Sequence, residues 1–267
     1  MKRYRVGTSG YSYDDWKGPF YPRDLPKNRM LEFYAGHFSC SEINATYYAI
    51  PGTQVFERLV LKVPDDFDFI VKVNRETTHI RKENETALKA LTASILPLRE
   101  AGCFKGFLAQ FPYSFKNTEM NRRYLSETRR FCSNLPLFAE FRHQSWNKPA
   151  LHDFLKSLDI GYVNVDEPEL DGLLPAESVV TTDTAYIRFH GRNKKDWWDG
   201  KGMARYDYAY NEEELRGWLT NISTILNKAY KTYIFFNNHP NGQAVRNAKQ
   251  MINILEKAQK NLFRQNS

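Results

Sequence analysis

The 267-residue sequence is poor in cysteine and has no long apolar segment. Its three cysteines, Cys40, Cys103 and Cys132, lie far apart and form no CxxC pair, so we expect reduced thiols. No apolar run approaches the roughly 20 residues that a membrane-spanning helix needs. Residues 1–7 also lack the apolar core of a secretion signal. These absences predict a cytoplasmic protein with no membrane partner.

Several catalytic motifs are absent as well. The first predicted strand is not followed by GxGxxG, and no GxSxG occurs, which disfavours dinucleotide binding and a serine triad. HxH and HExxH are also missing. Metal ligands could still come from Glu140, His143, Asp166, His190 and His239. Nearby arginines disfavour a cation there, so we predict no metal and no cofactor.

The chain is moderately basic. Lysine and arginine number 38 against 31 acidic residues, a formal net charge of +7, and aromatic residues make up 15%. A basic balance favours anionic partners such as nucleic acid or phosphorylated metabolites. The charges form no long block, however, which equally suits a soluble enzyme without a polyanion partner.

Strand-like apolar runs alternate with helix-like patterns along the whole chain. The strand-like runs cover residues 4–7, 42–45, 67–73, 104–111, 137–141, 162–165, 186–189 and 233–236. Helical periodicity follows each of the others, but the acidic, proline-bearing residues 167–184 show none. This alternation predicts an α/β fold over residues 1–267: a single (β/α)8 TIM-type barrel, with an irregular segment in place of the sixth helix. A doubly wound open sheet is the alternative. Helix caps are expected at Asn84, at Asn117 or Thr118, and at Asn211.

Polar residues gather at the C-terminal ends of the predicted strands. If the apolar alternates face the helices, the barrel interior receives Glu42, Asn44, Lys72, Gln110, Glu140, Arg142, Asn164, Asp166, Arg188, His190 and Asn237. Functional groups of such barrels lie at this face. The basic members Lys72, Arg142 and Arg188 can offset the acidic ones. An ion-pair network that merely closes the barrel is the alternative interpretation.

Residue types suggest a division of roles at this face. Glu42 or Glu140 would serve as general acid or base, with His143 or His190 as a second proton carrier. The predicted substrate-binding residues are Asn44, Lys72, Gln110, Arg142, Asp166, Arg188, Arg192, Asn237 and Asn238. Among them Arg188 is expected to be the strongest anion contact, because its planar fork fits phosphate or carboxylate.

Two loops have the composition of an anion site. They are residues 190–195 and residues 237–242, which follow the seventh and eighth predicted strands, where such barrels often bind phosphate. In the alternative interpretation, Asn241 caps the last helix and the lysines are solvated. Aromatic residues crowd the same end and suit a stacking rim for a sugar or base: Tyr11, Tyr13, Trp16, Tyr47, Tyr48, Trp197, Trp198, Tyr206 and Tyr208.

The sequence resembles the YecE-like family, a group of unknown function, along nearly its whole length. The matching segments are residues 7–10, 16–22, 42–48, 110–112, 140–146, 188–192 and 236–238, together with Lys72, Thr78, His79, Gly242, Ala244, Asn247 and Ala248. Tyr11 stands where the family often has tryptophan. The resemblance implies a TIM barrel and supplies no activity. Barrel similarity to endonuclease-IV-like and xylose-isomerase-like proteins suggests nucleic-acid or sugar ligands only by fold analogy.

Two functions are compatible with these patterns. The first is an enzyme, a hydrolase, isomerase or lyase, acting on a small anionic substrate such as a phosphorylated sugar or nucleotide. The second is a non-enzymatic or nuclease-like protein that binds nucleic acid through basic loops and aromatic stacking. A deep pocket would favour the first and a broad basic surface the second. No oligomeric state is inferred from the sequence.

Overall fold

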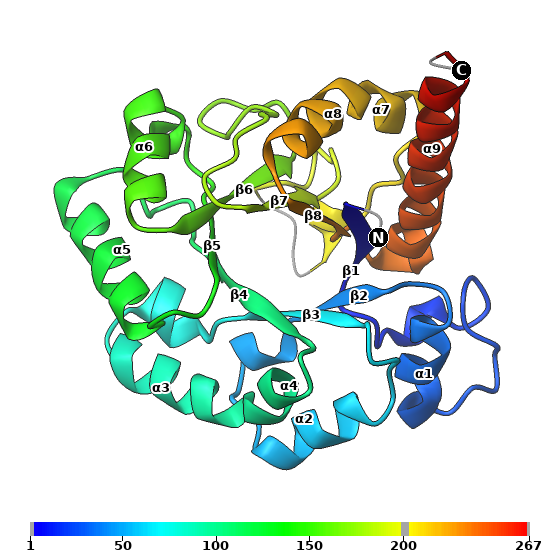
Figure 1. The fold of residues 1–267 in the computed structure, drawn as a ribbon, viewed down its shortest axis with the longest axis horizontal. Coiled ribbons are helices and arrows are strands. Elements are labelled where there is room, and N and C mark those ends of the chain that lie inside the picture. Colours follow the sequence, from blue (N-terminus) through cyan, green and yellow to red (C-terminus); the bar gives the residue numbers. More distant parts are fainter. Residues whose placement is uncertain (1–2, 199–202, 266–267) are drawn as a thin grey trace.

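The computed structural model describes residues 3–198 and 203–265, and these form a closed barrel of parallel strands (Figure 1). Each strand pairs with the next, and β8 pairs with β1 to close the ring. The strands are β1 (Tyr4–Ser9), β2 (Cys40–Ile43), β3 (Asp68–Lys72), β4 (Phe104–Gln110), β5 (Leu137–Glu140), β6 (Ile160–Asp166), β7 (Thr184–Phe189) and β8 (Lys231–Phe236). The predicted (β/α)8 fold is confirmed.

Helices surround the barrel on its outside (Figure 1). They are α1 (Met30–Ala35), α2 (Thr53–Val60), α3 (Asn84–Ser94), α4 (Leu96–Glu100), α5 (Glu119–Phe131), α6 (Pro149–Ser157), α7 (Glu212–Gly217), α8 (Leu219–Lys228) and α9 (Gln243–Gln265). Residues 167–183, all of them described, contain no helix, as predicted. In the described part of the chain, no helix is both long and apolar enough to cross a membrane.

The predicted helix caps have mixed outcomes. Asn211 begins α7 with a capping box, in which its side chain accepts from the Glu214 N–H and Glu214 accepts from the Asn211 N–H. Thr118 caps α5 by accepting from the Asn121 N–H. The prediction for Asn84 is wrong: the cap position of α3 is Glu83, and the Asn84 amide donates to Thr128 across to α5.

The middle of the barrel is filled by aromatic side chains. Phe138 of β5 contacts Tyr186 of β7, whose ring lies 5.3 Å from that of Phe235. Glycine at positions 106 and 161 makes room for Phe138, because a Cβ there would lie 2.6 and 2.4 Å from its ring. This packed layer separates the two polar ends of the barrel.

A separate ion-pair network lies at the N-terminal end of the strands. The buried Asp68 carboxylate accepts from Lys231 Nζ at 2.6 Å and from the Tyr233 hydroxyl at 2.7 Å, and Arg5 Nε lies 2.9 Å from it. This end is opposite the expected site, so its network is suited to holding β1, β3 and β8 together.

Candidate functional site

The Arg188 guanidinium occupies the centre of the C-terminal end of the barrel. Its Nε and Nη2 donate to the two oxygens of Glu42, each at 2.8 Å, and its Nη1 donates to Glu140 Oε2 at 2.6 Å. Ser9 accepts a further bond from Nη2, and the Tyr186 hydroxyl donates to Glu42 Oε1 at 2.6 Å. All five side chains are buried. Strands β1, β2, β5 and β7 are therefore joined by one charge-paired group.

A second arginine extends this network away from the barrel axis. Arg142 Nη2 lies 2.6 Å from Glu140 Oε1, and Nη1 donates to Glu167 Oε2 at 2.9 Å. Glu167 also accepts from the Leu174 N–H in the irregular segment. The Trp197 ring lies 5.7 Å from the Arg142 guanidinium carbon. Glu167 and Tyr186 were not predicted from the sequence. Tyr186 could have been, because it lies two residues before Arg188 on the same strand and so points to the same side.

His190 lies between Glu140 and Asn237. Its Nε2 is 3.2 Å from Glu140 Oε1, and its Nδ1 is 3.1 Å from Asn237 Nδ2. Arg142 Nη2 also lies 3.2 Å from Nε2. A neutral ring with its proton on Nε2 donates to Glu140 and accepts from Asn237. Burial, reinforced by the positive charge of Arg142, lowers the pKa of His190 to about 3, so the ring is neutral at physiological pH.

Burial and the arginine charges set the ionisation of the carboxyl groups. Burial by itself would raise the pKa of Glu140, but Arg188 and Arg142 outweigh it and hold this pKa well below its usual range. For Glu167 burial prevails over Arg142 and raises the pKa to about 7. Glu140 is thus a fixed carboxylate, whereas Glu167 titrates near neutrality.

A cavity of about 700 Å³ opens above this network, at the mouth of the barrel. Six strands or the loops that follow them, β1 to β4, β7 and β8, contribute to its wall. The predicted residues that line it are Glu42, Asn44, Lys72, Gln110, Arg188 and Asn237. Glu140, Arg142 and His190 pack beside them in the network.

Lys72 lies at the end of β3 on the wall of this cavity. Its Nζ donates to Gln110 Oε1 at 2.7 Å and lies 4.7 Å from the centre of the Tyr47 ring. Burial, with the nearby positive charge of Arg188, lowers the pKa of Lys72 to about 7. Lys72 is therefore partly protonated near neutral pH.

Aromatic rings from four loops, those after β1, β2, β7 and β8, line another part of the wall. Tyr13 stacks on His239 with ring centres 4.6 Å apart, and Tyr206 lies 5.9 Å from the same histidine. Tyr48, at the edge, is 74% exposed. Burial lowers the pKa of His239 to about 4, so this ring is neutral. The wall combines flat apolar faces with a few polar groups, as small-molecule sites do.

Strand β6 faces the opposite way from the prediction. Val165 is the register partner of Arg188 on the neighbouring strand, so both side chains point into the barrel. Because side chains alternate along a strand, Val163 also points inward, whereas Asn164 and Asp166 point outward. Asn164 bonds both backbone groups of Val179. The inward positions predicted for Asn164 and Asp166 are therefore wrong.

Asp166 instead holds the outer layer together. Its carboxylate accepts from the Tyr210 hydroxyl at 2.6 Å, from Trp218 Nε1 at 2.5 Å and from two nitrogens of Arg192. Arg192 is thereby drawn away from the barrel mouth. Asn238 also points outward, donating to the Tyr208 carbonyl and to Asn247. These contacts give Arg192 and Asn238 partners within the protein.

In each of the two loops expected to bind an anion, one donor is bound by a carboxylate of the protein itself, while Lys194 and Lys195 are exposed. Asp15 accepts from the Asn241 N–H at 2.7 Å, just as Asp166 accepts from Arg192. Asn241 does not cap α9, since it has a positive φ within a turn that precedes the helix.

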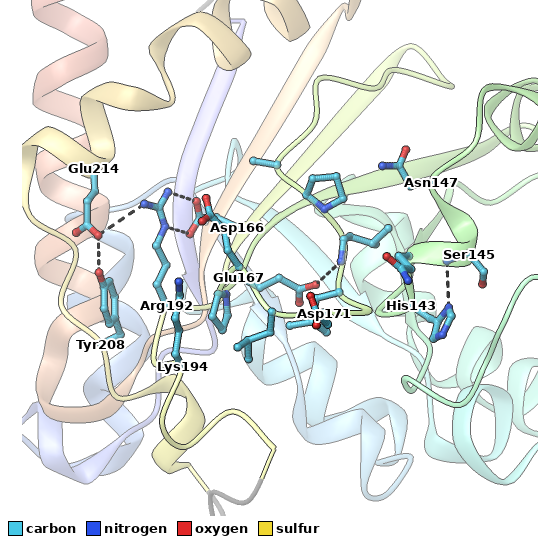
Figure 2. Close-up of a pocket in the computed structure, with 18 of the residues that line it drawn as sticks. His143, Ser145, Asn147, Asp166, Glu167, Asp171, Arg192, Lys194, Tyr208 and Glu214 are labelled. Carbon is cyan, nitrogen blue, oxygen red and sulfur yellow. Dashed lines mark hydrogen bonds and ion pairs between the residues drawn. The ribbon is translucent and has the colours of Figure 1, made fainter.

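A second cavity, of about 1050 Å³, lies beside the irregular segment (Figure 2). His143 is at its edge, where Nδ1 accepts from the Ser145 N–H, and Arg192 and Glu214 are on the other side. The structure thus separates His143 from the Glu42–Arg188 network. Within residues 3–198 and 203–265, no group of three or more histidine, cysteine, aspartate or glutamate side chains is arranged to hold a metal ion.

Comparisons with known proteins identify relatives along the whole chain. A family model described as "Protein of unknown function DUF72" matches residues 5–267. The UPF0759 protein YunF of Bacillus subtilis is 30% identical over 268 residues, covering 94% of both chains. A crystal structure of a DUF72 family protein from Thermotoga maritima superposes with a TM-score of 0.89 at 41% identity, covering 95% of this chain and 99% of that one. A DUF72 family structure from Enterococcus faecalis gives a TM-score of 0.85 at 28% identity, covering 95% of each chain.

Proposed function

The chain belongs to the family described as protein of unknown function DUF72, and we propose that its barrel mouth binds a small anionic ligand and supplies acid–base chemistry to it. A phosphorylated sugar or a nucleotide fits the proposal, since the cavity of about 700 Å³ has both aromatic faces and polar groups.

The observation that carries the proposal is the environment of Lys72. Arg188 and Arg142 are each paired with two carboxylates. Lys72, by contrast, has no carboxylate within ion-pair distance among the residues that the structure describes, and it lies on the cavity wall. An anionic ligand would provide the missing partner and would stabilise the protonated form.

Lys72 also suits the acid–base role better than the carboxylates expected to play it. A pKa of about 7 lets one group accept and release a proton near neutral pH. Glu42 lines the cavity and stays a candidate, but Arg188 holds both of its oxygens. Glu140 and His190 lie in the network that positions Arg188 and Arg142, so we assign them a positioning role.

Nucleic-acid binding is the alternative. The exposed aromatic rings of Tyr48 and Trp198 support it, because exposed rings can stack on bases. A cavity with the cations Lys72 and Arg205 in its wall supports the small ligand instead. Binding of single-stranded oligonucleotides with a steep salt dependence, without binding of inorganic phosphate, would favour the alternative.

Calorimetry with inorganic phosphate tests the proposal. Lys72→Met should weaken phosphate binding about 10- to 100-fold, the loss of a charge-assisted contact worth roughly 1.5–3 kcal/mol. Lys72→Arg should retain much of the affinity. Lys228→Met removes an exposed lysine at the end of α8 and should leave binding unchanged. Equal binding by wild type and Lys72→Met would overturn the proposal.

A further inference from the structure

We infer that Lys72 is a nucleophile that forms a Schiff base with a small aldehyde or ketone carrying a carboxylate or phosphate group. The inference rests on the proposed function, because the same cavity at the barrel mouth would receive this compound. It goes further by assigning a covalent step and a chemical class of substrate.

The surroundings of Lys72 do not favour its charged form. The amine is half-buried, its polar contact is the neutral oxygen of Gln110, and the Tyr47 ring covers one side. A buried ammonium is ordinarily paired with a carboxylate, because burial otherwise disfavours its charge. Here the available carboxylates, Glu42 and Glu140, are bound by Arg188.

Arg188 also places a fixed positive charge in the same network. Its guanidinium is held by three side chains from three other strands, so it cannot move away from Lys72 when that amine is protonated. Burial together with this charge brings the pKa of Lys72 to about 7. Near neutral pH the fraction of free amine is then about a thousandfold larger than for a surface lysine. Desolvation and a neighbouring cation are the two means by which proteins prepare lysine for Schiff-base formation.

The step balances without an added reagent. The free electron pair of Lys72 Nζ forms a bond to the carbonyl carbon, and the π pair of the carbonyl moves to its oxygen. Both amine protons then leave with that oxygen as one water molecule, which gives a neutral imine. The amides of Asn44 and Asn237 line the cavity and are suited to hydrogen-bond the carbonyl oxygen. Arg205 lines the same cavity and offers a cation to the anionic group of the compound.

Borohydride trapping on the intact protein tests the inference. The protein is incubated at neutral pH with pyruvate, an anionic ketone, or with glyceraldehyde 3-phosphate, an anionic aldehyde. Sodium borohydride then reduces any imine to a stable amine, and peptide mass spectrometry locates it. We expect modification of Lys72 to exceed that of exposed Lys228 at least about tenfold, given the difference in free amine. Trapping should fall when phosphate competes.

Lys72→Arg separates the two proposals, because it keeps the charge but cannot form an imine. It should retain phosphate affinity and lose the adduct at this position. If wild type binds phosphate and Lys72 is modified no more than Lys228, the inference is wrong and the proposed function stands. If Lys72 is trapped selectively but phosphate does not bind, the anion-site proposal is wrong. Absence of both results overturns both.

Discussion

Replacing Arg188 by methionine should strongly destabilise the protein. Arg188 donates four hydrogen bonds, two to Glu42, one to Glu140 and one to Ser9, and its side chain is almost fully buried. Removing one partner of a buried ion pair leaves uncompensated charge and costs about 3–5 kcal/mol. We expect a loss of that size in the free energy of unfolding, measured with urea.

The loss should depend on pH. Burial by itself raises the pKa of Glu140, so without Arg188 this carboxylate must, near pH 8, either stay ionised without that partner or take up a proton at a free-energy cost. Near pH 5 protonation of the buried carboxyl group costs less free energy, so the stability lost by Arg188→Met relative to wild type should be smaller there. Arg216→Met is the control, since its partner Glu212 is exposed and the pair is worth at most about 1 kcal/mol. An Arg188→Met loss no larger than this, or one that is independent of pH, would refute the reasoning.

Three further predictions concern stability. Lys72→Met should be more stable than wild type, with the largest difference at pH 7 and below and the smallest near pH 10.5. The pKa of Lys72 is lowered in the folded state, so wild type becomes more stable as pH rises from about 7 to 10.5 and the difference shrinks; chemical denaturation at several pH values checks this. The stability of Glu167→Gln relative to wild type should increase as pH rises from about 4.5 to 7, because the raised pKa of Glu167 makes wild type lose stability over that range. A stability difference that does not change with pH would contradict the raised pKa. Gly161→Ala should lower the melting temperature, with a loss of about 1–3 kcal/mol, because the new Cβ would lie 2.4 Å from Phe138; Gly217→Ala, which has open space, should be neutral or stabilising.

The fold could be predicted from the sequence because alternation of strands and helices is a local pattern. Residues 137–141 and 186–189, for example, each read as a short apolar strand, and β5 and β7 lie there. The helix-free segment was predictable in the same way, because prolines and acids without helical period disfavour a helix.

The side to which each β6 residue points could not be predicted, because α6 covers only part of the outer face of β6 and the irregular segment covers another part. The rule that apolar alternates face the helices assumes a helical layer. At β6 the backbone of Val179 satisfies Asn164, while Tyr210 and Trp218 satisfy Asp166, so polar residues are stable outside and Val165 lies inside. Such partners are distant in sequence and leave no local signal.

The candidate site shows the same limit. Alternation of side chains along the strands correctly predicted that Glu42, Glu140 and Arg188 lie together. It did not predict that the two carboxylates would accept hydrogen bonds from all three nitrogens of the Arg188 guanidinium. Charge pairing of this kind depends on distances across the barrel. Because the two carboxylates are paired with Arg188, they do not pair with Lys72, which was one of several predicted binding residues. An anionic ligand would therefore supply Lys72 with a charge partner.

The measurement that tests the central claim most directly is the affinity of wild type for sulfate as a function of pH, because sulfate itself does not titrate in this range. If protonated Lys72 is the anion contact, affinity should be constant below about pH 6 and should fall through pH 7 toward the level of Lys72→Met as the amine loses its proton. Lys72→Arg should bind with little pH dependence over the same range. A wild-type profile that is flat up to pH 9, or sulfate binding that survives unchanged in Lys72→Met, would contradict the account.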